Sequence, residues 1–334
     1  MKTNELRASD RPLAAAYDTA LLDLDGVVYR SREAVPHAVP SLLAAAQQGM
    51  RLTYVTNNAS RTPETVAEHL VELGLPAKVD EVVTAAQAVA RLIAEQVPKG
   101  AAVLAIGGEG LFQALTSHGL TLVKSADDDP VAVVQGYVPE TTWEDLAEAA
   151  YAVGRGVPWF AANADVSMPT ARGIAPGNGA LVTAVAVATG KWPTVAGKPE
   201  PALHRETMLR TGAKHPLVVG DRLDTDIEGA NRAGADSLLV FTGVTDEAVL
   251  LAAEPKHRPT YIAADLRGLL EPALAPERDG GGWRCGAWRA EVVEGEVKCE
   301  KDGGADADAG DPLDELRARC AATWERADGK KDGE

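Results

Sequence analysis

The sequence is short of aromatic and basic side chains. Phe, Trp and Tyr make up 4% of the 334 residues, so a buried core has to rely on Ala, Val and Leu. Lys and Arg number 33 against 49 Asp and Glu, which leaves a formal net charge of −16. Nucleic acids bind to basic surfaces and anionic lipids repel acidic proteins, so we expect neither as a partner.

Long apolar runs and paired cysteines are also missing. No stretch of about 18 consecutive apolar residues occurs, which argues against a membrane protein. The first residues, MKTNE, lack the apolar core of an export signal, so we expect a cytoplasmic location. The three cysteines, Cys285, Cys299 and Cys320, form no C-x-x-C pair. We expect reduced, partly buried thiols there rather than a disulfide or a zinc site.

The most informative segment that is present is DLDGVVY at residues 23–29. It follows an apolar run at 20–22, which predicts a short buried strand. Asp23 and Asp25 then project from the carboxyl end of that strand, where open α/β sheets bind their ligands. Two like charges so close together require a cation or a shared proton, and Mg²⁺ prefers carboxylate and carbonyl oxygens. Taken alone, an ordinary Asp-Gly turn would also explain the segment.

Two further segments place polar groups after strand ends. VTNNAS at residues 55–60 precedes a helix start with Pro63 at the first helical position. Its hydroxyl, amide and backbone N–H groups suit phosphate oxygens, although a capping loop would have the same composition. GKP at residues 197–199 holds a Lys in a short turn, where it could supply a point charge to a phosphate or remain a solvated surface side chain.

The fourth segment, residues 217–227, reads as a buried strand, a Gly, several carboxylates and a helix start. The helix is expected to end near Ala233, with Gly234 just beyond it. Within the segment, Asp224 is interpreted as a helix-capping carboxylate rather than a ligand. Arg222 is interpreted as a solvated or structural charge.

Taken together, the four segments resemble the four sequence motifs of the haloacid dehalogenase superfamily, in its phosphatase branch. More narrowly, the chain resembles the NagD-type or p-nitrophenylphosphatase-like family over roughly residues 15–273. That resemblance implies an α/β fold, with a doubly wound parallel-sheet core and an α/β cap inserted between the second and third motifs. A dehalogenase needs only the nucleophilic Asp, so the second carboxylate at Asp25 favours the phosphatases.

The resemblance also implies roles for the carboxylates. Asp23 is expected to be the nucleophile that forms an aspartyl-phosphate, and Asp25 the general acid and then the general base. Mg²⁺ is expected on Asp23, on the backbone carbonyl of Asp25 and on Asp221. Asp226 is expected to orient a metal-bound water or the Lys of the third motif from the outer shell.

Phosphate and leaving-group contacts are implied in the same way. Thr56, Asn57 and Lys198 are expected to bind the non-bridging oxygens of the phosphate. In the cap, the run from 163 to 179 resembles the family's cap signature, and its segment 167–172 is expected over the active site. Met168 and Arg172 are the candidate specificity residues there, with ordinary loop residues as the alternative.

The alternation of strands and helices predicts where the domains lie. The glycine-rich turn at residues 107–110 lacks the G-x-G-x-x-G spacing of a nucleotide loop and is interpreted as a turn of the cap. The linkers near Thr84–Gln87 and Trp192–Ala196 are candidate hinges. The expected domains are a core (1–86 and 193–273), a cap (87–192) and a small C-terminal ββα appendage (274–334).

The appendage departs from the usual family length. Two strands at 283–290 and 292–299 are expected to form a hairpin, followed by a flexible stretch at 301–310 whose D-x-D pattern lacks the rest of a calcium loop. The final helix carries an apolar stripe that should pack on the phosphatase body or on a second subunit. The stripe consists of Leu313, Leu316, Cys320 and Trp324.

The appendage also bears on function. A similar one occurs in an actinobacterial subgroup that acts on glycerol 3-phosphate, and it looks like a fragment of an acetyltransferase fold. Nothing in this sequence supplies an acyl-CoA loop, so we expect no transferase activity.

The functional prediction is Mg²⁺-dependent hydrolysis of a small phosphate monoester, with glycerol 3-phosphate as the first candidate. Phosphoglycolate, pyridoxal phosphate and sugar phosphates are the alternative substrates. Two other classes stay open at this point, namely a phosphotransferase and a non-catalytic ligand-sensing regulator. A homodimer formed through the cap is expected by resemblance.

Overall fold

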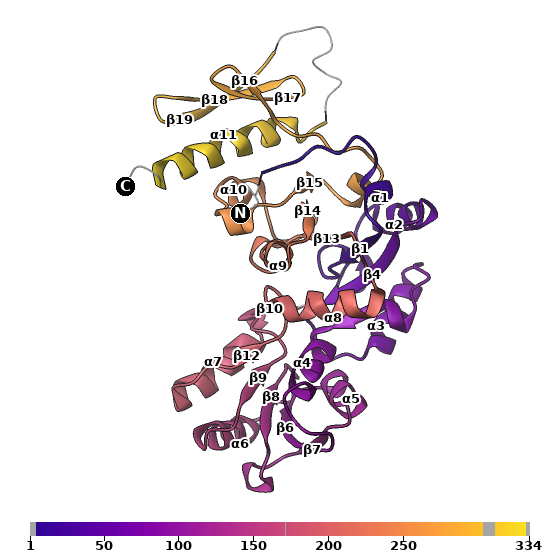
Figure 1. The fold of residues 1–334 in the computed structure, drawn as a ribbon, viewed down its shortest axis with the longest axis vertical. Coiled ribbons are helices and arrows are strands. Elements are labelled where there is room, and N and C mark those ends of the chain that lie inside the picture. Colours follow the sequence, from indigo (N-terminus) through magenta and orange to yellow (C-terminus); the bar gives the residue numbers. More distant parts are fainter. Residues whose placement is uncertain (1–4, 171, 303–310, 332–334) are drawn as a thin grey trace. The chain divides into compact units, whose positions relative to one another are not determined.

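The computed structural model describes residues 5–170, 172–302 and 311–331 (Figure 1). The chain divides into two compact units: the first comprises residues 1–52 and 213–334, and the second residues 53–212. Most of the Asp-rich stretch at 301–310, with its D-x-D pattern, lies outside the described residues. Within the described ranges, no helix combines the length and the apolar character needed to cross a membrane.

Parallel strands form the centre of the first unit. β13 (Pro216–Gly220) pairs with β1 (Thr19–Leu22) on one side and β14 (Asp236–Val240) on the other, and β14 pairs with β15 (Tyr261–Ala263). The residues of these strands are almost all buried, as a sheet covered on both faces requires. With β4 (Arg51–Thr56) and β5 (Val82–Thr84), the six-stranded order is β15-β14-β13-β1-β4-β5, which confirms the predicted parallel α/β core.

Short helices and turns connect the strands of the first unit. Gly234 has a φ of 71° and ends the helix that stops at Ala233, as predicted. The elements are α1 (Leu13–Ala16), β2 (Tyr29–Arg30), β3 (Glu33–Ala34), α2 (Ala38–Gln47), the π-helical η3 (Leu223–Ile227), α9 (Glu228–Ala233), α10 (Glu247–Leu251), η4 (Pro255–His257) and η5 (Leu266–Leu269).

The C-terminal part is an antiparallel sheet packed on a helix, and it has more strands than expected. β16 (Glu277–Asp279), β17 (Gly282–Cys285), β18 (Trp288–Val293) and β19 (Glu296–Lys301) pair in sequence order. The predicted strand at 283–290 is broken because Gly286, with a φ of 55°, turns the chain between β17 and β18. The predicted turn at Glu294 and Gly295 is present, with positive φ at both residues.

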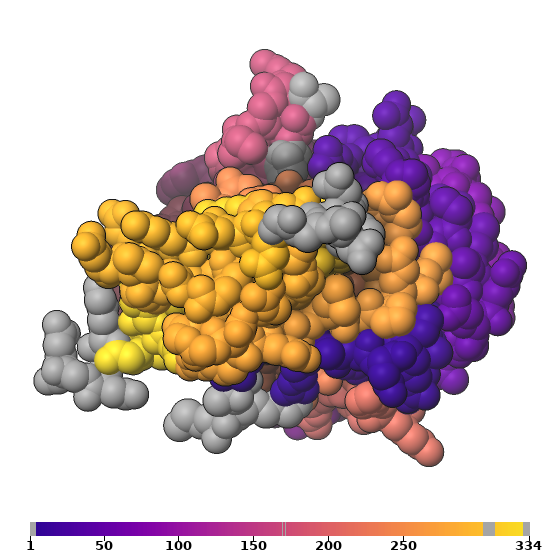
Figure 2. All heavy atoms as spheres, turned by 90° about the horizontal axis from the view of Figure 1, so that it is seen from above, coloured from indigo at the N-terminus to yellow at the C-terminus, as the bar shows by residue number. Residues whose placement is uncertain are grey.

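The helix α11 (Asp314–Lys331) attaches this sheet to the rest of the first unit. In Figure 2 the sheet and α11 form one continuous orange and yellow surface. The apolar stripe of α11 is buried in a cluster with core residues from other elements, which places the helix on the body of the same chain. The core residues of that cluster include Leu223, Ile227, Leu239, Leu250 and Ile262.

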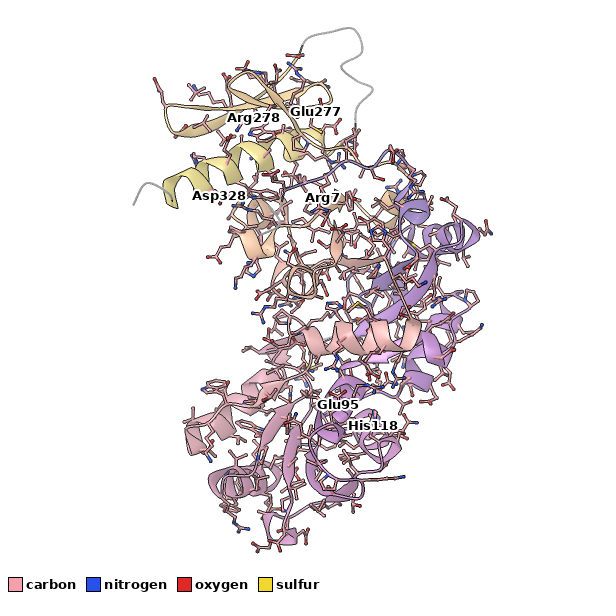
Figure 3. The ribbon with its side chains drawn as sticks, in the orientation of Figure 1. Arg7, Glu95, His118, Glu277, Arg278 and Asp328 are labelled. Carbon is pink, nitrogen blue, oxygen red and sulfur yellow. The ribbon has the colours of Figure 1, made fainter. Side chains whose placement is uncertain are left out.

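Polar contacts support the same packing. The Arg258 guanidinium, 4% exposed, donates two hydrogen bonds of 2.6 and 2.9 Å to the Asp328 carboxylate. Figure 3 labels Asp328 near the end of α11. The Cζ atom of Arg258 also lies over the Trp324 ring, 5.1 Å from the ring centroid. Buried Arg317 donates from Nη2 to the Ile262 carbonyl at 3.1 Å. Because both ends of α11 are held, the helix is an integral part of the first unit.

The cysteines of this part are free thiols, as predicted, and none forms a disulfide within the described residues. Burial raises the pKa of Cys285 and of Cys320 to about 12, and that of Cys299 to about 11. All three therefore stay protonated at neutral pH.

A second parallel sheet forms the core of the second unit, with the order β12-β9-β8-β6-β7. Its strands are β6 (Ala102–Ile106), β7 (Thr121–Val123), β8 (Ala132–Gln135), β9 (Trp159–Ala161) and β12 (Thr194–Val195). The remaining elements are α3 (Pro63–Glu72), η1 (Val79–Glu81), α4 (Ala85–Ala94), α5 (Glu109–Ser117), η2 (Ala126–Asp128), α6 (Trp143–Gly154), the hairpin β10 (Ser167–Thr170) and β11 (Gly173–Pro176), α7 (Asn178–Thr189) and α8 (Pro201–Thr211).

The glycine-rich turn at 107–110 begins α5, and close packing explains its glycines. A Cβ added to Gly110 would lie 2.1 Å from the Arg61 carbonyl oxygen, and one on Gly108 would lie 2.8 Å from the Ser60 carbonyl oxygen. The Gly110 N–H donates to that Ser60 oxygen at 3.1 Å. The structure thus confirms a turn whose glycines allow two backbones to touch.

The first candidate hinge is a well-capped helix start. The Gln87 N–H donates to Thr84 Oγ1 at 3.4 Å, and the Thr84 N–H donates to Gln87 Oε1 at 3.0 Å, which is a capping box. Motion at this point stays a prediction.

We predict that Leu316→Ala lowers the free energy of unfolding by about 2–5 kcal/mol, because it removes buried contacts and leaves a cavity in the cluster under α11. Urea unfolding followed by circular dichroism measures the change. The matched control is Leu209→Ala on α8, where the side chain is 58% exposed, and its effect should stay below about 0.5 kcal/mol. Equal effects of the two substitutions would contradict the packing of α11 on the body.

Candidate active site

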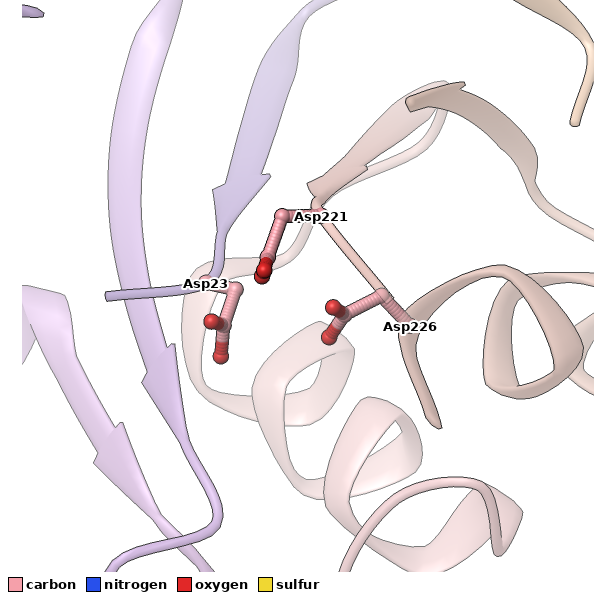
Figure 4. A group of neighbouring side chains, drawn as sticks. All are labelled: Asp23, Asp221 and Asp226. Atoms are coloured by element: carbon pink, nitrogen blue, oxygen red, sulfur yellow. The ribbon is translucent and has the colours of Figure 1, made fainter. Parts of the chain in front are cut away.

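Three carboxylates converge at one end of the parallel strands of the first unit (Figure 4). Asp23 follows β1 and Asp221 follows β13, and these two strands are hydrogen-bonded neighbours. Asp226 lies in η3, one short turn later. One oxygen from each carboxylate lies within 4.8 Å of the others. The structure therefore brings together Asp23, Asp221 and Asp226, which the sequence predicted as neighbours.

Two glycines, Gly26 and Gly243, lie against the Asp221 carboxylate. A Cβ added to Gly243 would lie 1.8 Å from Asp221 Oδ2, and one added to Gly26 would lie 2.8 Å from it. Gly26 also has a φ of 91°, which favours glycine. The Val244 N–H donates to Asp221 Oδ2 at 2.7 Å and fixes the orientation of the carboxylate.

Asp226 is held by the backbone of the same segment. The Arg222 N–H donates to Asp226 Oδ2 at 3.2 Å, and a Cβ on Gly220 would clash with the Asp226 side chain. Asp224 does not cap the helix, so that interpretation was wrong: its carboxylate instead accepts two hydrogen bonds from the Arg222 guanidinium at 3.1 and 2.8 Å. Among the described residues, no side chain caps the start of η3. Arg222 is a structural charge, as predicted.

Asp25 lies on the loop that follows Asp23, and its side chain is exposed. Buried Leu24 separates the two aspartates, and its carbonyl accepts hydrogen bonds from the N–H groups of Val28 and Tyr29 at 2.9 and 3.1 Å. The loop is therefore locally ordered. The expected roles of Asp25 in proton transfer and of its carbonyl in metal binding stay predictions.

The carboxylate group fits a hard divalent cation. Asp221 and Asp226 are each 1% exposed, so their charges repel one another with little screening by water. Removing charges from water without a partner of opposite sign is costly. Oxygen donors at this spacing are the ligands that Mg²⁺ prefers, and soft metals would favour Cys or His instead.

A second polar group lies in the second unit and contains Thr56, Asn57 and Lys198. Thr56 ends β4, and its Oγ1 accepts from the Asn58 N–H at 3.1 Å. Asn57 Oδ1 accepts from the Lys198 N–H at 2.8 Å, and Asn57 Nδ2 donates to the Lys198 carbonyl at 3.1 Å. The predicted neighbourhood of the second and third motifs is thus present within this unit.

Lys198 is buried, being 4% exposed, and its charge acts on buried His204 of α8. Burial, with a smaller contribution from the Lys198 charge, lowers the pKa of His204 to about 3. The imidazole is therefore neutral at physiological pH. Neither of its ring nitrogens has a hydrogen-bond partner within the described residues.

The candidate specificity residues lie on the β10–β11 hairpin. Met168 is half-buried on β10, and Arg172 is exposed just before β11. The Arg172 N–H donates to Thr170 Oγ1 at 3.2 Å, which shapes the hairpin end. Their role in substrate selection stays a prediction.

Several contacts in this group could not be predicted from the sequence. Asp165 accepts from Asn57 Nδ2, and the Asn163 amide donates to the Asn57 carbonyl at 2.8 Å. Both belong to the run that resembles the cap signature, which was the available signal. Gly243 and Val244 carried no signal, because a tertiary contact defines their role.

Known proteins share this fold and these motifs. Residues 20–121 match a family model described as haloacid dehalogenase-like hydrolase, and residues 195–269 match one described as HAD-hydrolase-like. Residues 285–333 match a GCN5-related N-acetyltransferase like domain, in agreement with the resemblance of the appendage to a fragment of that fold.

Individual relatives match over longer stretches. D-glycerol 3-phosphate phosphatase of Mycobacterium tuberculosis is 46% identical over 94% of this chain and 88% of its own length. The crystal structure of a glycerol phosphate phosphatase from the same organism in complex with magnesium has a TM-score of 0.86 at 45% identity, covering 94% of this chain and 92% of that one. The p-nitrophenyl phosphatase from Archaeoglobus fulgidus has a TM-score of 0.71 at 31% identity, covering 76% and 98%.

The fold, the aspartate group and these matches define a haloacid dehalogenase-like hydrolase. Within that superfamily the chain belongs to the NagD and p-nitrophenylphosphatase family, whose members identify it as a phosphoric monoester hydrolase.

We predict that acid weakens the fold through His204. The unfolded chain binds a proton at the ordinary His pKa of 6.5, whereas the folded chain binds it only near 3, so the unfolded state carries more protons across that window. Stability should therefore fall as pH decreases below 6.5. Relative to His204→Leu, the free energy of unfolding should drop by roughly 1 kcal/mol per pH unit.

Urea unfolding of both proteins between pH 7.5 and 4.5 measures this slope. Above pH 7 the two curves should run parallel, which serves as the internal control. Parallel curves down to pH 4.5 would show that His204 is protonated in the folded protein and would contradict its burial as a neutral ring.

Proposed function

We propose that the protein hydrolyses glycerol 3-phosphate, or a small phosphate monoester like it, with Mg²⁺ as cofactor. The observation that carries this proposal is the convergence of Asp23, Asp221 and Asp226 at the ends of adjacent parallel strands. A buried carboxylate group of this kind holds a cation next to a potential nucleophile. The family matches support the same chemistry.

Asp23 is the proposed nucleophile, because it leads the first motif and is the least buried of the three carboxylates. It attacks phosphorus and forms an aspartyl-phosphate while the substrate alkoxide leaves. Asp25 donates a proton to that alkoxide and then takes one from the water that hydrolyses the aspartyl-phosphate. Asp23, Asp221 and the Asp25 carbonyl would hold Mg²⁺, with Asp226 in the outer shell. The bound ion would supply positive charge to the phosphoryl oxygens.

We propose that the second polar group, which carries the second and third motifs, binds phosphate. The Thr56 hydroxyl and the Lys198 ammonium are the donors for its non-bridging oxygens. His204 is neutral and adds no charge of its own near Lys198. The Asn57 side chain has partners of its own in Lys198 and Asp165.

The choice of glycerol 3-phosphate rests on coverage. The relative with that substrate in its name aligns along 94% of this chain, C-terminal part included, whereas the p-nitrophenyl phosphatase covers 76%. Met168 and Arg172 on the β10–β11 hairpin are the proposed specificity residues. Phosphoglycolate, pyridoxal phosphate and sugar phosphates are the substrates to compare. A cytoplasmic location and a homodimer formed through the cap remain predictions from the sequence.

A phosphate-release panel tests the proposal. Purified protein with Mg²⁺ should release phosphate from glycerol 3-phosphate with the highest kcat/KM of the four substrate types. EDTA should abolish the release, and added Mg²⁺ should restore it, because the aspartate group needs its cation. Transfer of phosphate to added alcohols instead of water would indicate a phosphotransferase. No turnover on the whole panel would contradict an enzymatic function.

Two substitutions control this experiment. Asp23→Asn should lower kcat by at least about 10³-fold, because the amide cannot form the covalent intermediate. Asp224→Asn is the matched control, since Asp224 is exposed and pairs with Arg222 outside the carboxylate group, and its kcat should stay within about twofold of wild type. Retained activity in Asp23→Asn would disprove the nucleophile.

A further inference from the structure

The amide of Asn57 brackets one residue of the third motif. Its Oδ1 accepts from the Lys198 N–H at 2.8 Å, and its Nδ2 donates to the Lys198 carbonyl at 3.1 Å. The two hydrogen bonds fix the peptide groups on both sides of the Lys198 Cα. The direction in which the lysine side chain leaves the backbone is therefore set by Asn57, more than 140 residues earlier in the sequence.

The partners settle which end of the amide points where. A backbone N–H can only donate and a carbonyl can only accept, so Oδ1 must face the Lys198 nitrogen. The second hydrogen of Nδ2 points to the Asp165 carboxylate, at 3.3 and 3.4 Å from its two oxygens. Both donor hydrogens of the side chain are thus used within the protein. A phosphate dianion accepts hydrogen bonds, and this amide has no donor left to offer it.

The surroundings are built for this arrangement. A Cβ on Gly197 would lie 2.8 Å from Asn57 Oδ1 and 2.6 Å from the Ala162 carbonyl oxygen, so only glycine lets the amide approach Lys198. The Asn163 amide donates to the Asn57 carbonyl at 2.8 Å, and Asn163 Oδ1 accepts from the Asp165 N–H at 3.3 Å. The position of Asn57 is therefore held from its backbone as well.

We propose that the Asn57 side chain is a positioning residue for Lys198 and not a phosphate ligand, and that Asp165 orients it. This proposal rests on the proposed function, in which Lys198 binds the phosphoryl oxygens. Asn57 acts through the lysine: it places the ammonium group, and the lysine makes the contact. Because Asp165 lies just before the β10–β11 hairpin, the orientation of Asn57 also depends on that segment of the chain.

A double-mutant cycle separates positioning from direct binding. Phosphate release is measured for wild type, Asn57→Ala, Lys198→Ala and the double variant. Misplacing Lys198 should lower kcat/KM of Asn57→Ala by about 10- to 100-fold. In the Lys198→Ala background the same substitution should cost less than about threefold, because the residue through which it acts is gone. A further loss of tenfold or more in that background would mean that Asn57 binds the substrate itself and would overturn the proposal.

A charge exchange tests the contact with Asp165. Asn57→Asp puts two carboxylates face to face, sets a carboxylate oxygen against the Lys198 carbonyl, and should lower kcat/KM. Adding Asp165→Asn removes the first of these two repulsions and should recover at least about fivefold. A double exchange no better than Asn57→Asp alone would refute the role of Asp165. This pair also decides the matter if circular dichroism shows that Asn57→Ala does not fold.

The matched control is Asn231→Ala in the first unit. The Asn231 amide also donates to two backbone carbonyls, of Lys256 and Arg258, at 2.8 and 3.1 Å. Its kcat/KM should stay within about twofold of wild type. Asn57→Ala with the same small effect would overturn the proposal.

Failure of the proposed function and failure of the positioning role of Asn57 give different experimental results. Wild-type protein that releases no phosphate overturns the proposed function and, with it, this inference. Wild-type activity in Lys198→Ala overturns the assignment of Lys198 and the positioning role that depends on it. An active wild type, a weakened Lys198→Ala and an additive cycle overturn the positioning role alone.

Discussion

Repulsion between three carboxylates is the constraint on which the first unit depends. Asp221 and Asp226 are buried, and together with Asp23 they offer oxygens within 4.8 Å of one another. Backbone N–H groups of Val244 and Arg222 compensate part of this charge. The remainder calls for a cation, and the parallel pairing of β1 with β13 is what holds the carboxylates together against their repulsion.

Packing elsewhere in the first unit follows from this requirement. Glycines at 26, 220 and 243 stand where any side chain would collide with Asp221 or Asp226. The π-helical turn that carries Asp226 is anchored from behind, because its Leu223 and Ile227 belong to the cluster that α11 completes. The C-terminal helix therefore supports the segment that presents one of the carboxylates, even though it lies far from them in sequence.

Much of this arrangement could be predicted because strand ends carry local patterns. An apolar run followed by DLDG or GDRLD indicates carboxylates at a sheet edge, and Gly234 and the Glu294–Gly295 turn are equally local signals. What could not be predicted arises between distant segments. The approach of Gly243 to Asp221 and of Asn57 to Asp165 has no periodicity or spacing to reveal it. Asp224 was misinterpreted because its carboxylate pairs with the Arg222 side chain and does not cap η3.

We propose that Asp23, Asp221 and the Asp25 carbonyl hold one divalent cation, with Asp226 in the outer shell. Crystals of the protein soaked in Mn²⁺, which replaces Mg²⁺ and scatters anomalously, test it most directly. We expect an anomalous peak among the carboxylates of Asp23, Asp221 and Asp226, about 2 Å from an oxygen of Asp23 and an oxygen of Asp221. An anomalous map without a peak there, at a Mn²⁺ concentration that saturates other sites, would contradict it.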